Sequence, residues 1–153
     1  MSENSTSAQF CYNSVYRHGV DEKRRLQIPA KWRTGEEEDL TLILWPNGPH
    51  REGCLLALPP AEWNSLVQKL KNMPFSDPKA DSLRRLIGKK SDQVHVDKSG
   101  RISLREAMVK AAGIEKEAIL VGLVDRFEIW NPERYEAASA VDEALSSEAF
   151  SLI

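Results

Sequence analysis

The chain has 153 residues, enough for one ordinary domain or for two small fused halves with a hydrophobic core. Its formal net charge is −2, and its two cysteines, Cys11 and Cys54, exclude a disulfide framework and a cysteine-rich zinc site. No apolar run is long enough to cross a bilayer, and the polar start of the chain lacks the apolar segment of a signal peptide. The composition therefore predicts a soluble, cytoplasmic protein with free thiols.

The charge is distributed unevenly along the chain. Residues 115–153 contain nine acidic and three basic residues, a net charge of −6, which leaves +4 for residues 1–114. Two solvated surfaces of different sign would explain this pattern. A basic face for a polyanion, with an acidic tail pointing elsewhere, would explain it equally well. Segregation of charge alone does not choose between the two interpretations.

The chain begins with small polar residues, which predict a flexible arm over residues 1–12. Loose alternation up to Val20 predicts a strand that leads into a first charged turn, residues 21–25, with Asp21 and Arg25 four positions apart. Leu26 and Ile28 then alternate with a polar residue, the period of a half-buried strand. The first charged turn is therefore expected to lead into a short strand.

The elements that follow complete a first half of the chain. Residues 29–33 predict a short helical turn, and the apolar runs 40–45 and 54–58 predict a hairpin with a roomy connection. From Pro60 the apolar residues follow a helical period, and Pro78 opens a second helix that Gly88 is expected to end. Four cations cluster near that end of the helix, namely Arg84, Arg85, Lys89 and Lys90. They complement the helix dipole there, and whether some of them also contact a polyanion stays open.

The plan then repeats. Asp97 and Arg101 bound a second charged turn, residues 97–101, at an offset of 76 residues from the first. Ser103 and Glu106 have the spacing of a capping box at the start of a short helix that Gly113 closes. Apolar runs 118–124 and 127–130 predict a second hairpin, and residues 131–133 open another helix with an N-cap, a proline and an acid. Internal similarity at a fixed offset indicates a unit that is used twice.

These residues together resemble the MraZ family of bacterial DNA-binding regulators, which consist of two fused AbrB-like halves. The resemblance covers roughly residues 13–145. It rests on the paired Asp-x-x-x-Arg motifs, on residues 16–21, which lead into the first motif, and on residues 28–33, which follow it. It also rests on the second hairpin, where Val121-x-x-Val124 is followed by residues 127–130.

The resemblance implies an α+β, β-rich fold, a double-ψ-like barrel with swapped hairpins, formed by halves at residues 13–90 and 91–153. It also implies a ring-shaped homo-oligomer that binds direct repeats of double-stranded DNA upstream of the division and cell-wall gene cluster, in the cytoplasm and on the nucleoid. One departure matters: the family's first motif usually has glycine where this chain has Arg24. Without glycine, either the turn changes its geometry or Arg24 bears the strain of a positive φ.

The proposed DNA contacts come from the cations of the two turns. Arg25 is the first candidate, because a guanidinium can bridge two phosphate oxygens or bind the O6 and N7 atoms of guanine. The other candidates are Lys23, Arg24, Lys98 and Arg101. Asp21 is expected to pair with Arg25 or to cap turn amides, and Asp97 and Gly100 to shape the second turn in the same way. A purely structural role for both Asp–Arg pairs remains the alternative, more so in the second turn, which has fewer cations.

The sequence does not favour catalysis. His18, His50 and His95 are far apart without a metal-ligand spacing, and no phosphate loop or nucleophile motif occurs. We therefore expect no enzyme activity, no metal, no cofactor, no small-molecule substrate and no membrane partner. The second hypothesis is a ring-forming structural or protein-interaction protein that lacks specific DNA binding and uses its acidic final helix on a protein partner.

Overall fold

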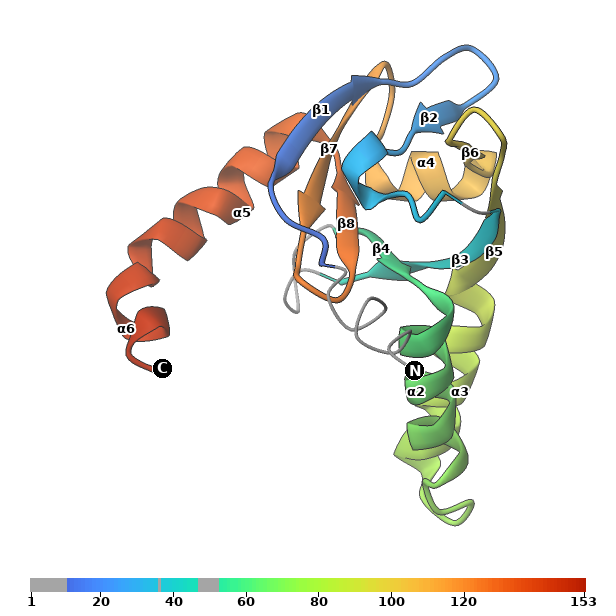
Figure 1. Cartoon of the computed structure of the whole chain (residues 1–153). Helices are drawn as coiled ribbons and strands as arrows, with labels where there is room; N and C mark the ends of the chain where they lie inside the picture. Colours follow the sequence, from blue (N-terminus) through green and yellow to red (C-terminus); the bar gives the residue numbers. More distant parts are fainter. Residues whose placement is uncertain (1–10, 36, 47–52) are drawn as a thin grey trace, which may run out of the picture.

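The computed structural model describes residues 11–35, 37–46 and 53–153, and shows an α+β fold rich in β-structure. A curved sheet lies beside a short ribbon of two strands, and helices extend outward from them (Figure 1). The strands are β1 (Val15–Gly19), β2 (Arg25–Gln27), β3 (Glu38–Trp45), β4 (Cys54–Leu58), β5 (Ser91–Val96), β6 (Arg101–Ser103), β7 (Glu117–Gly122) and β8 (Phe127–Trp130). The helices are the 3-10 turn η1 (Ala30–Trp32), α2 (Pro60–Lys71), α3 (Pro78–Lys90), α4 (Glu106–Ala112), α5 (Pro132–Ala144) and α6 (Ser146–Phe150).

The element order confirms that the chain repeats one plan. The first half runs through β1, the first charged turn, β2, η1, the β3–β4 hairpin and α2. The second half runs through β5, the second charged turn, β6, α4, the β7–β8 hairpin and α5. Helix α3 joins the two halves, and α6 follows the second one.

Strands of both halves form one antiparallel sheet, in the order β1-β7-β8-β4-β3-β5. The β3–β4 hairpin of the first half pairs with β5 and β8, and the β7–β8 hairpin of the second half pairs with β1 and β4. Each hairpin therefore completes its pairing with strands of the other half. The two halves share one sheet and one core.

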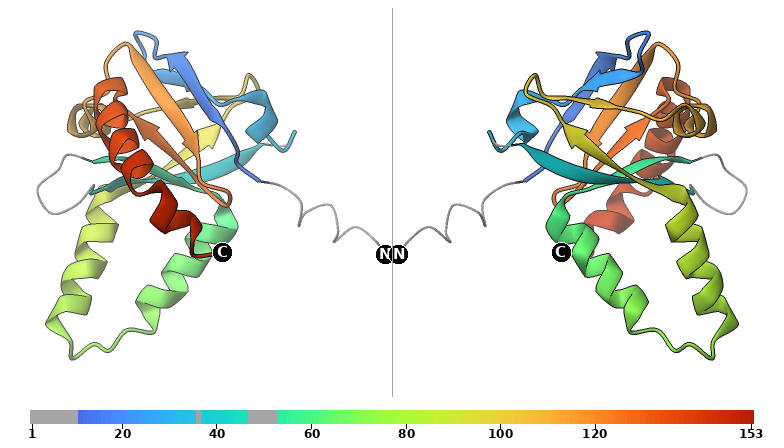
Figure 2. Two further views of the ribbon diagram at one scale, coloured as in Figure 1. Left: turned by 90° about the vertical axis from the view of Figure 1, so that its left-hand side faces the viewer. Right: turned by 90° about the vertical axis from the view of Figure 1, so that its right-hand side faces the viewer.

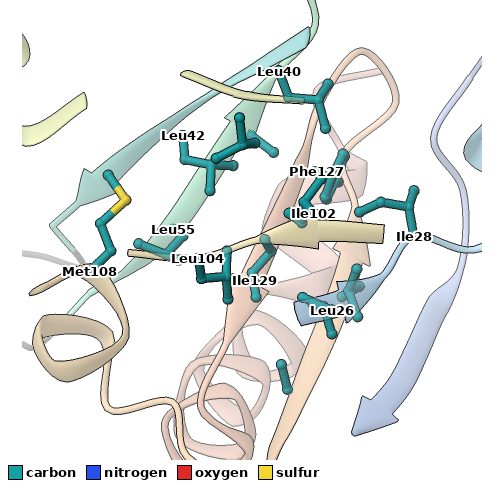
Figure 3. Packing of buried hydrophobic residues seen from close by; sticks show 14 of the residues in the cluster. Leu26, Ile28, Leu40, Leu42, Leu55, Ile102, Leu104, Met108, Phe127 and Ile129 are labelled. Atoms are coloured by element: carbon teal, nitrogen blue, oxygen red, sulfur yellow. The ribbon is translucent and has the colours of Figure 1, made fainter. Parts of the chain in front are cut away.

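The ribbon of β2 and β6 covers the main core. Leu26 and Ile102 face each other in its register and are at most 1% exposed. Figure 3 shows the ribbon's apolar side chains directed at those of the sheet, with Leu40 and Phe127 among them. The alternation after each charged turn thus buries one face of a strand, as the period-2 pattern predicts.

The hairpin strands are buried on both faces, which explains their continuous apolar runs. In β4, Leu55 and Ala57 belong to the core under the ribbon, while Leu56 and Leu58 pack with residues of α2 and α3. All five residues of β4 are buried. Alternation is lost wherever a strand has no solvent-facing side.

The proline-based predictions of helix starts are confirmed. Pro60, Pro78 and Pro132 occupy the first turns of α2, α3 and α5. Two other predictions were wrong. Helix α3 continues through Gly88 to Lys90, since glycine lowers helix stability without stopping a helix. Ser103 belongs to β6 and caps nothing, so α4 begins after Arg105 without a side-chain cap.

The start of the described chain is anchored in the core. Tyr12 is buried, exchanges two backbone hydrogen bonds with Val124, and packs its ring against Trp32 and Phe127. It therefore does not belong to the flexible arm predicted over residues 1–12. The rest of that arm, residues 1–10, and most of the predicted hairpin connection, residues 47–52, lie outside the described residues. Over the ranges that are described, no helix has the length and apolar character needed to span a membrane.

Candidate nucleic-acid interface

The first charged turn is closed by Asp21. Its Oδ1 atom accepts hydrogen bonds from the backbone N–H groups of Lys23 and Arg25, at 2.9 and 2.8 Å. The N–H of Arg24 donates to the Asp21 carbonyl, at 2.9 Å. These bonds lower the pKa of the Asp21 carboxyl, the backbone bond from Arg25 contributing most. A charged Asp21 therefore fixes the turn and leaves Lys23 exposed at its tip.

The same carboxylate holds the Arg25 side chain. Arg25 Nε donates to Asp21 Oδ2 at 2.7 Å. The two outer guanidinium nitrogens have no partner in the described part of the chain. About one third of the Arg25 side chain is exposed. This geometry presents an oriented pair of donors to solvent, the arrangement that suits phosphate oxygens or a guanine edge.

Arg24 occupies the position that usually requires glycine. Its φ is 60°, in the left-handed region, which costs a residue with a side chain about 1–2 kcal/mol. Two hydrogen bonds to Leu104 on the other half of the chain offset part of this cost. Arg24 Nε donates to the Leu104 carbonyl at 3.0 Å, and the Leu104 N–H donates to the Arg24 carbonyl at 2.8 Å. The turn thus keeps its geometry, and Arg24 bears the strain.

The second charged turn has the same backbone. Asp97 Oδ1 accepts from the N–H groups of Ser99 and Arg101, both at 2.9 Å, and Gly100 takes the positive φ, 82°. As in the first turn, the backbone bond from the arginine is the main cause that lowers the pKa of the Asp97 carboxyl. The side-chain pair is looser. Arg101 Nε lies 3.5 Å from Asp97 Oδ2, and this buried nitrogen has no hydrogen-bond partner among the described residues.

Residues of the first half hold the second charged turn in place. Gln27 Nε2 donates to the Ser99 carbonyl at 2.9 Å, and Arg33 Nη1 donates to the same oxygen at 3.3 Å. The Arg33 side chain lies against Gly100, where an added Cβ would collide with its guanidinium. Sequence reasoning missed both Gln27 and Arg33 as site residues. The missing signal was the pairing of β2 with β6, two strands from different halves of the chain.

The two turns lie at opposite ends of the ribbon. In its register Arg25 faces Ser103 and Gln27 faces Arg101, so each turn precedes one strand of an antiparallel pair. Figure 1 shows both turns at the end of the molecule that is remote from the α2–α3 hairpin. The fold therefore brings the predicted contacts of both motifs to one end.

A hollow of about 520 Å³ adjoins the second turn. Its walls carry the carboxylates of Glu37, Glu38 and Asp97 beside the cations of Arg33 and Lys98. The acids make this side of the second turn less favourable for a polyanion.

Two acidic side chains also flank an exposed histidine just before the second turn. His95 Nδ1 lies 2.9 Å from Asp39 and Nε2 lies 2.8 Å from Glu37. These bonds raise the pKa of His95, the one to Asp39 contributing most. Within the described residues, no group of three or more histidine, cysteine or acidic side chains is placed to hold a metal ion.

The basic cluster of α3 lies away from the turns, and one of its members is engaged. Arg84 donates to the carbonyls of Leu70 and Met73 and pairs with Asp81 at 2.8 Å. Its guanidinium lies 4.9 Å from the centre of the Phe75 ring. Arg84 therefore ties α2 to α3, which accounts for one cation of that cluster structurally.

Comparison with known proteins identifies a matching protein family. The family model described as MraZ protein matches residues 13–86 and 89–151. A protein of Acetivibrio thermocellus named transcriptional regulator MraZ is 34% identical over 134 residues, which cover 88% of this chain and 90% of that protein. Proteins of the same name from Lactobacillus delbrueckii subsp. bulgaricus and Clostridium tetani are 38% and 35% identical, over 86% and 79% of this chain and 87% and 82% of theirs.

Proposed function

The chain belongs to the MraZ family, and on this premise we propose that it is a sequence-specific, DNA-binding transcriptional regulator. The observation that carries the proposal is the Asp21–Arg25 pair, which orients a guanidinium whose outer nitrogens have no partner in the described chain. A residue that served only to pin the turn would need no outward-directed donors.

In the proposed complex the first turn makes the principal contact. Arg25 takes a guanine edge or bridges phosphate oxygens, and Lys23 and Arg24 bind neighbouring phosphates. Asp21 accepts the hydrogen bond from Arg25 Nε and so fixes the direction of Arg25. Lys98 and Arg101 of the second turn add weaker contacts, because acidic side chains lie beside them.

The proposed target is a set of direct repeats upstream of the division and cell-wall gene cluster, bound on the nucleoid by a ring of copies. A single chain of net charge −2 has little general attraction for DNA. Several copies bound to tandem repeats add their contacts through high effective concentration, so avidity supplies the affinity that one copy lacks.

We further propose that residues 13–90 and 91–153 are two copies of one AbrB-like unit with swapped hairpins in a double-ψ-like barrel. The pairing of each half's hairpin with strands of the other half supports this interpretation. The matching backbone of the two charged turns, with positive φ at Arg24 and Gly100, supports it as well.

The test is fluorescence anisotropy with a duplex from upstream of the protein's own gene and a scrambled duplex of equal length, over a salt series. We expect preference for the upstream duplex and affinity that falls steeply as salt rises, since each neutralised phosphate adds about −0.9 to the log–log slope. Equal and weak binding to both duplexes at every salt concentration would contradict the proposal.

The second candidate is a ring-forming protein without specific DNA binding. It is favoured by helices α5 and α6, in which no residue is fully buried. The two functions separate in one variant. If Arg25→Ala abolishes DNA binding while the oligomer persists, the regulator is supported, and if it dissolves the oligomer, the structural function is favoured.

A further inference from the structure

Two parts of the molecule extend from the β-structure, expose apolar side chains and carry opposite net charges. Residues 60–90, the α2–α3 hairpin, contain seven basic and three acidic residues, a net charge of +4. Residues 132–153, with α5 and α6, contain five acidic residues and one basic residue, a net charge of −4. In Figure 1 the two parts extend from different sides of the sheet. Figure 2 shows α2 and α3 joined at a tip that lies outside the β-structure.

The hairpin contains an apolar groove. A hollow of about 380 Å³ lies between α2 and α3, and its walls include Trp63, Val67, Leu70 and Ile87. Phe75 at the tip is 83% exposed. The charged residues of the walls, Lys71 and Arg84, are both cations.

A glycine leaves room in this groove. Gly88 lines the hollow from inside α3, where glycine costs about 1 kcal/mol relative to alanine. A Cβ at this position would meet no atom within 4 Å in the described structure. Packing among the described residues therefore does not require glycine at position 88. The close approach of a backbone from another copy would require it.

The α5–α6 segment has the matching properties. After its first turns, which pack through Tyr135 and Ala138 against the sheet, α5 continues outward. Val141, Leu145 and Phe150 are 38%, 49% and 71% exposed. The acids of this stretch, Asp142, Glu143 and Glu148, form no ion pair within the described part of the chain.

We propose that the α5–α6 segment of one copy docks in the groove between α2 and α3 of the next copy. A helical segment that places exposed apolar side chains in an apolar groove is a common mode of recognition, and opposite charges fix which surfaces meet. In this structure the segment does not lie in its own groove, because α5 leads away from the hairpin before the chain turns into α6 (Figure 1). The contact joins two different surfaces of neighbouring copies, so each copy can bind one neighbour through its groove and another through its α5–α6 segment. Such a head-to-tail contact forms a closed ring when the rotation between copies permits. It assigns surfaces to the homo-oligomer of the proposed function and does not depend on DNA binding.

The first test fills the groove. Gly88→Gln places a good helix former in the hollow and should leave each copy folded while assembly is lost. The matched control is Ser82→Gln, an exposed position of α3 that does not line this groove. Mass is measured by light scattering after gel filtration at tens of micromolar protein, and circular dichroism checks the fold. A monomeric wild type, or a Gly88→Gln protein with the mass of the wild type, would overturn the proposal.

The second test exchanges charge. Lys71→Glu should shift the assembly toward monomer, and adding Asp142→Lys and Glu143→Lys in the same chain should restore it. Failure to restore would assign the groove to another occupant and overturn the docking. Anisotropy with a duplex of a single repeat, measured on the Gly88→Gln monomer, reports the charged turns separately. Loss of assembly and loss of DNA binding are thereby distinguished.

Discussion

In the first charged turn the Arg25 Nε atom lies 2.7 Å from Asp21, whereas the matching distance between Arg101 and Asp97 is 3.5 Å. The backbones of the two turns match, with positive φ at Arg24 and at Gly100. Both turns also carry a formal charge of +1, because Glu22 offsets one of the three cations of the first turn. The net charge therefore does not distinguish the two turns, whereas the way in which each arginine is held does.

The difference teaches how one repeated motif can serve two purposes. The first turn orients its own arginine from within, by the Asp21 carboxylate. Asp97 closes the second turn in the same way but holds its arginine more loosely, and the side chains of Gln27 and Arg33 from the other half hold that turn in addition. We infer that the first turn is specialised for contact and the second for fixing the ribbon that carries both.

Removing the packing of the ribbon should affect both turns together and have the largest effect. Leu26 is fully buried against the sheet, so Leu26→Ala should lower the free energy of unfolding by about 2–5 kcal/mol. Urea denaturation followed by circular dichroism measures it. Ser103→Ala in the same ribbon is exposed and should change stability by less than about 0.5 kcal/mol. Equal effects of the two substitutions would show that the ribbon does not hold the turns.

Gly100→Ala should act on the second turn alone. The positive φ of 82° costs alanine about 1–2 kcal/mol, and its Cβ collides with the Arg33 guanidinium. The same substitution in an Arg33→Ala background should cost less, because the collision is gone. Thermal and urea unfolding of the four proteins of this double-mutant cycle give the coupling. An equal cost in both backgrounds would disprove the contact between Arg33 and Gly100.

The acid dependence of stability should differ between the turns. Folding lowers the pKa of Asp21 and of Asp97, so the unfolded chain binds protons first as the pH falls below about 4. Stability from each carboxylate is present above the unfolded pKa and is lost as the pH falls through the folded pKa. Asp21→Asn should remove more of this dependence than Asp97→Asn, since its ion pair is shorter. Melting temperatures measured in buffers from neutral to acidic pH test which substitution removes more of the pH dependence. A larger effect of Asp97→Asn than of Asp21→Asn would contradict the prediction.

The smallest effect is expected from the lysines of the turns. Each is exposed and acts as a point charge, so Lys23→Ala and Lys98→Ala should each reduce the salt slope of DNA binding by at most about one. Lys98 should contribute less, because Glu37 and Glu38 lie on the same hollow. Anisotropy over a salt series measures both slopes. A larger change for Lys98→Ala would indicate that the second turn lies closer to the phosphates.

Much of the fold could be predicted from local sequence. The repeated Asp-x-x-x-Arg motif, the strand periods and the prolines that open helices each act over a few residues, and the structure follows them. Arg24 in a glycine position predicted either a changed turn geometry or strain at Arg24, and its φ of 60° shows the second. Errors arose where a local pattern was overridden by its surroundings, as when Gly88 remained inside α3 and Ser103 joined β6.

The remainder depends on long-range contacts that a single sequence does not display. Nothing around Gln27 or Arg33 indicates that their side chains reach the carbonyl of Ser99 in the other half. The two backbone hydrogen bonds between Tyr12 and Val124 likewise join residues that are far apart in the sequence. Such contacts follow from the pairing of strands between the two halves, and the motif residues gave no information on that pairing.

The most direct test of the comparison is the DNA affinity of Arg25→Ala beside that of Arg101→Ala, measured by anisotropy on the upstream duplex at one fixed salt concentration. Loss of an oriented arginine should cost about 1–3 kcal/mol, roughly fivefold to 150-fold in Kd, and Arg101→Ala should cost clearly less. Both variants should keep the fold and the mass of the wild type. An equal or larger loss for Arg101→Ala, or unchanged affinity for Arg25→Ala, would contradict the assignment of the first turn as the principal DNA contact.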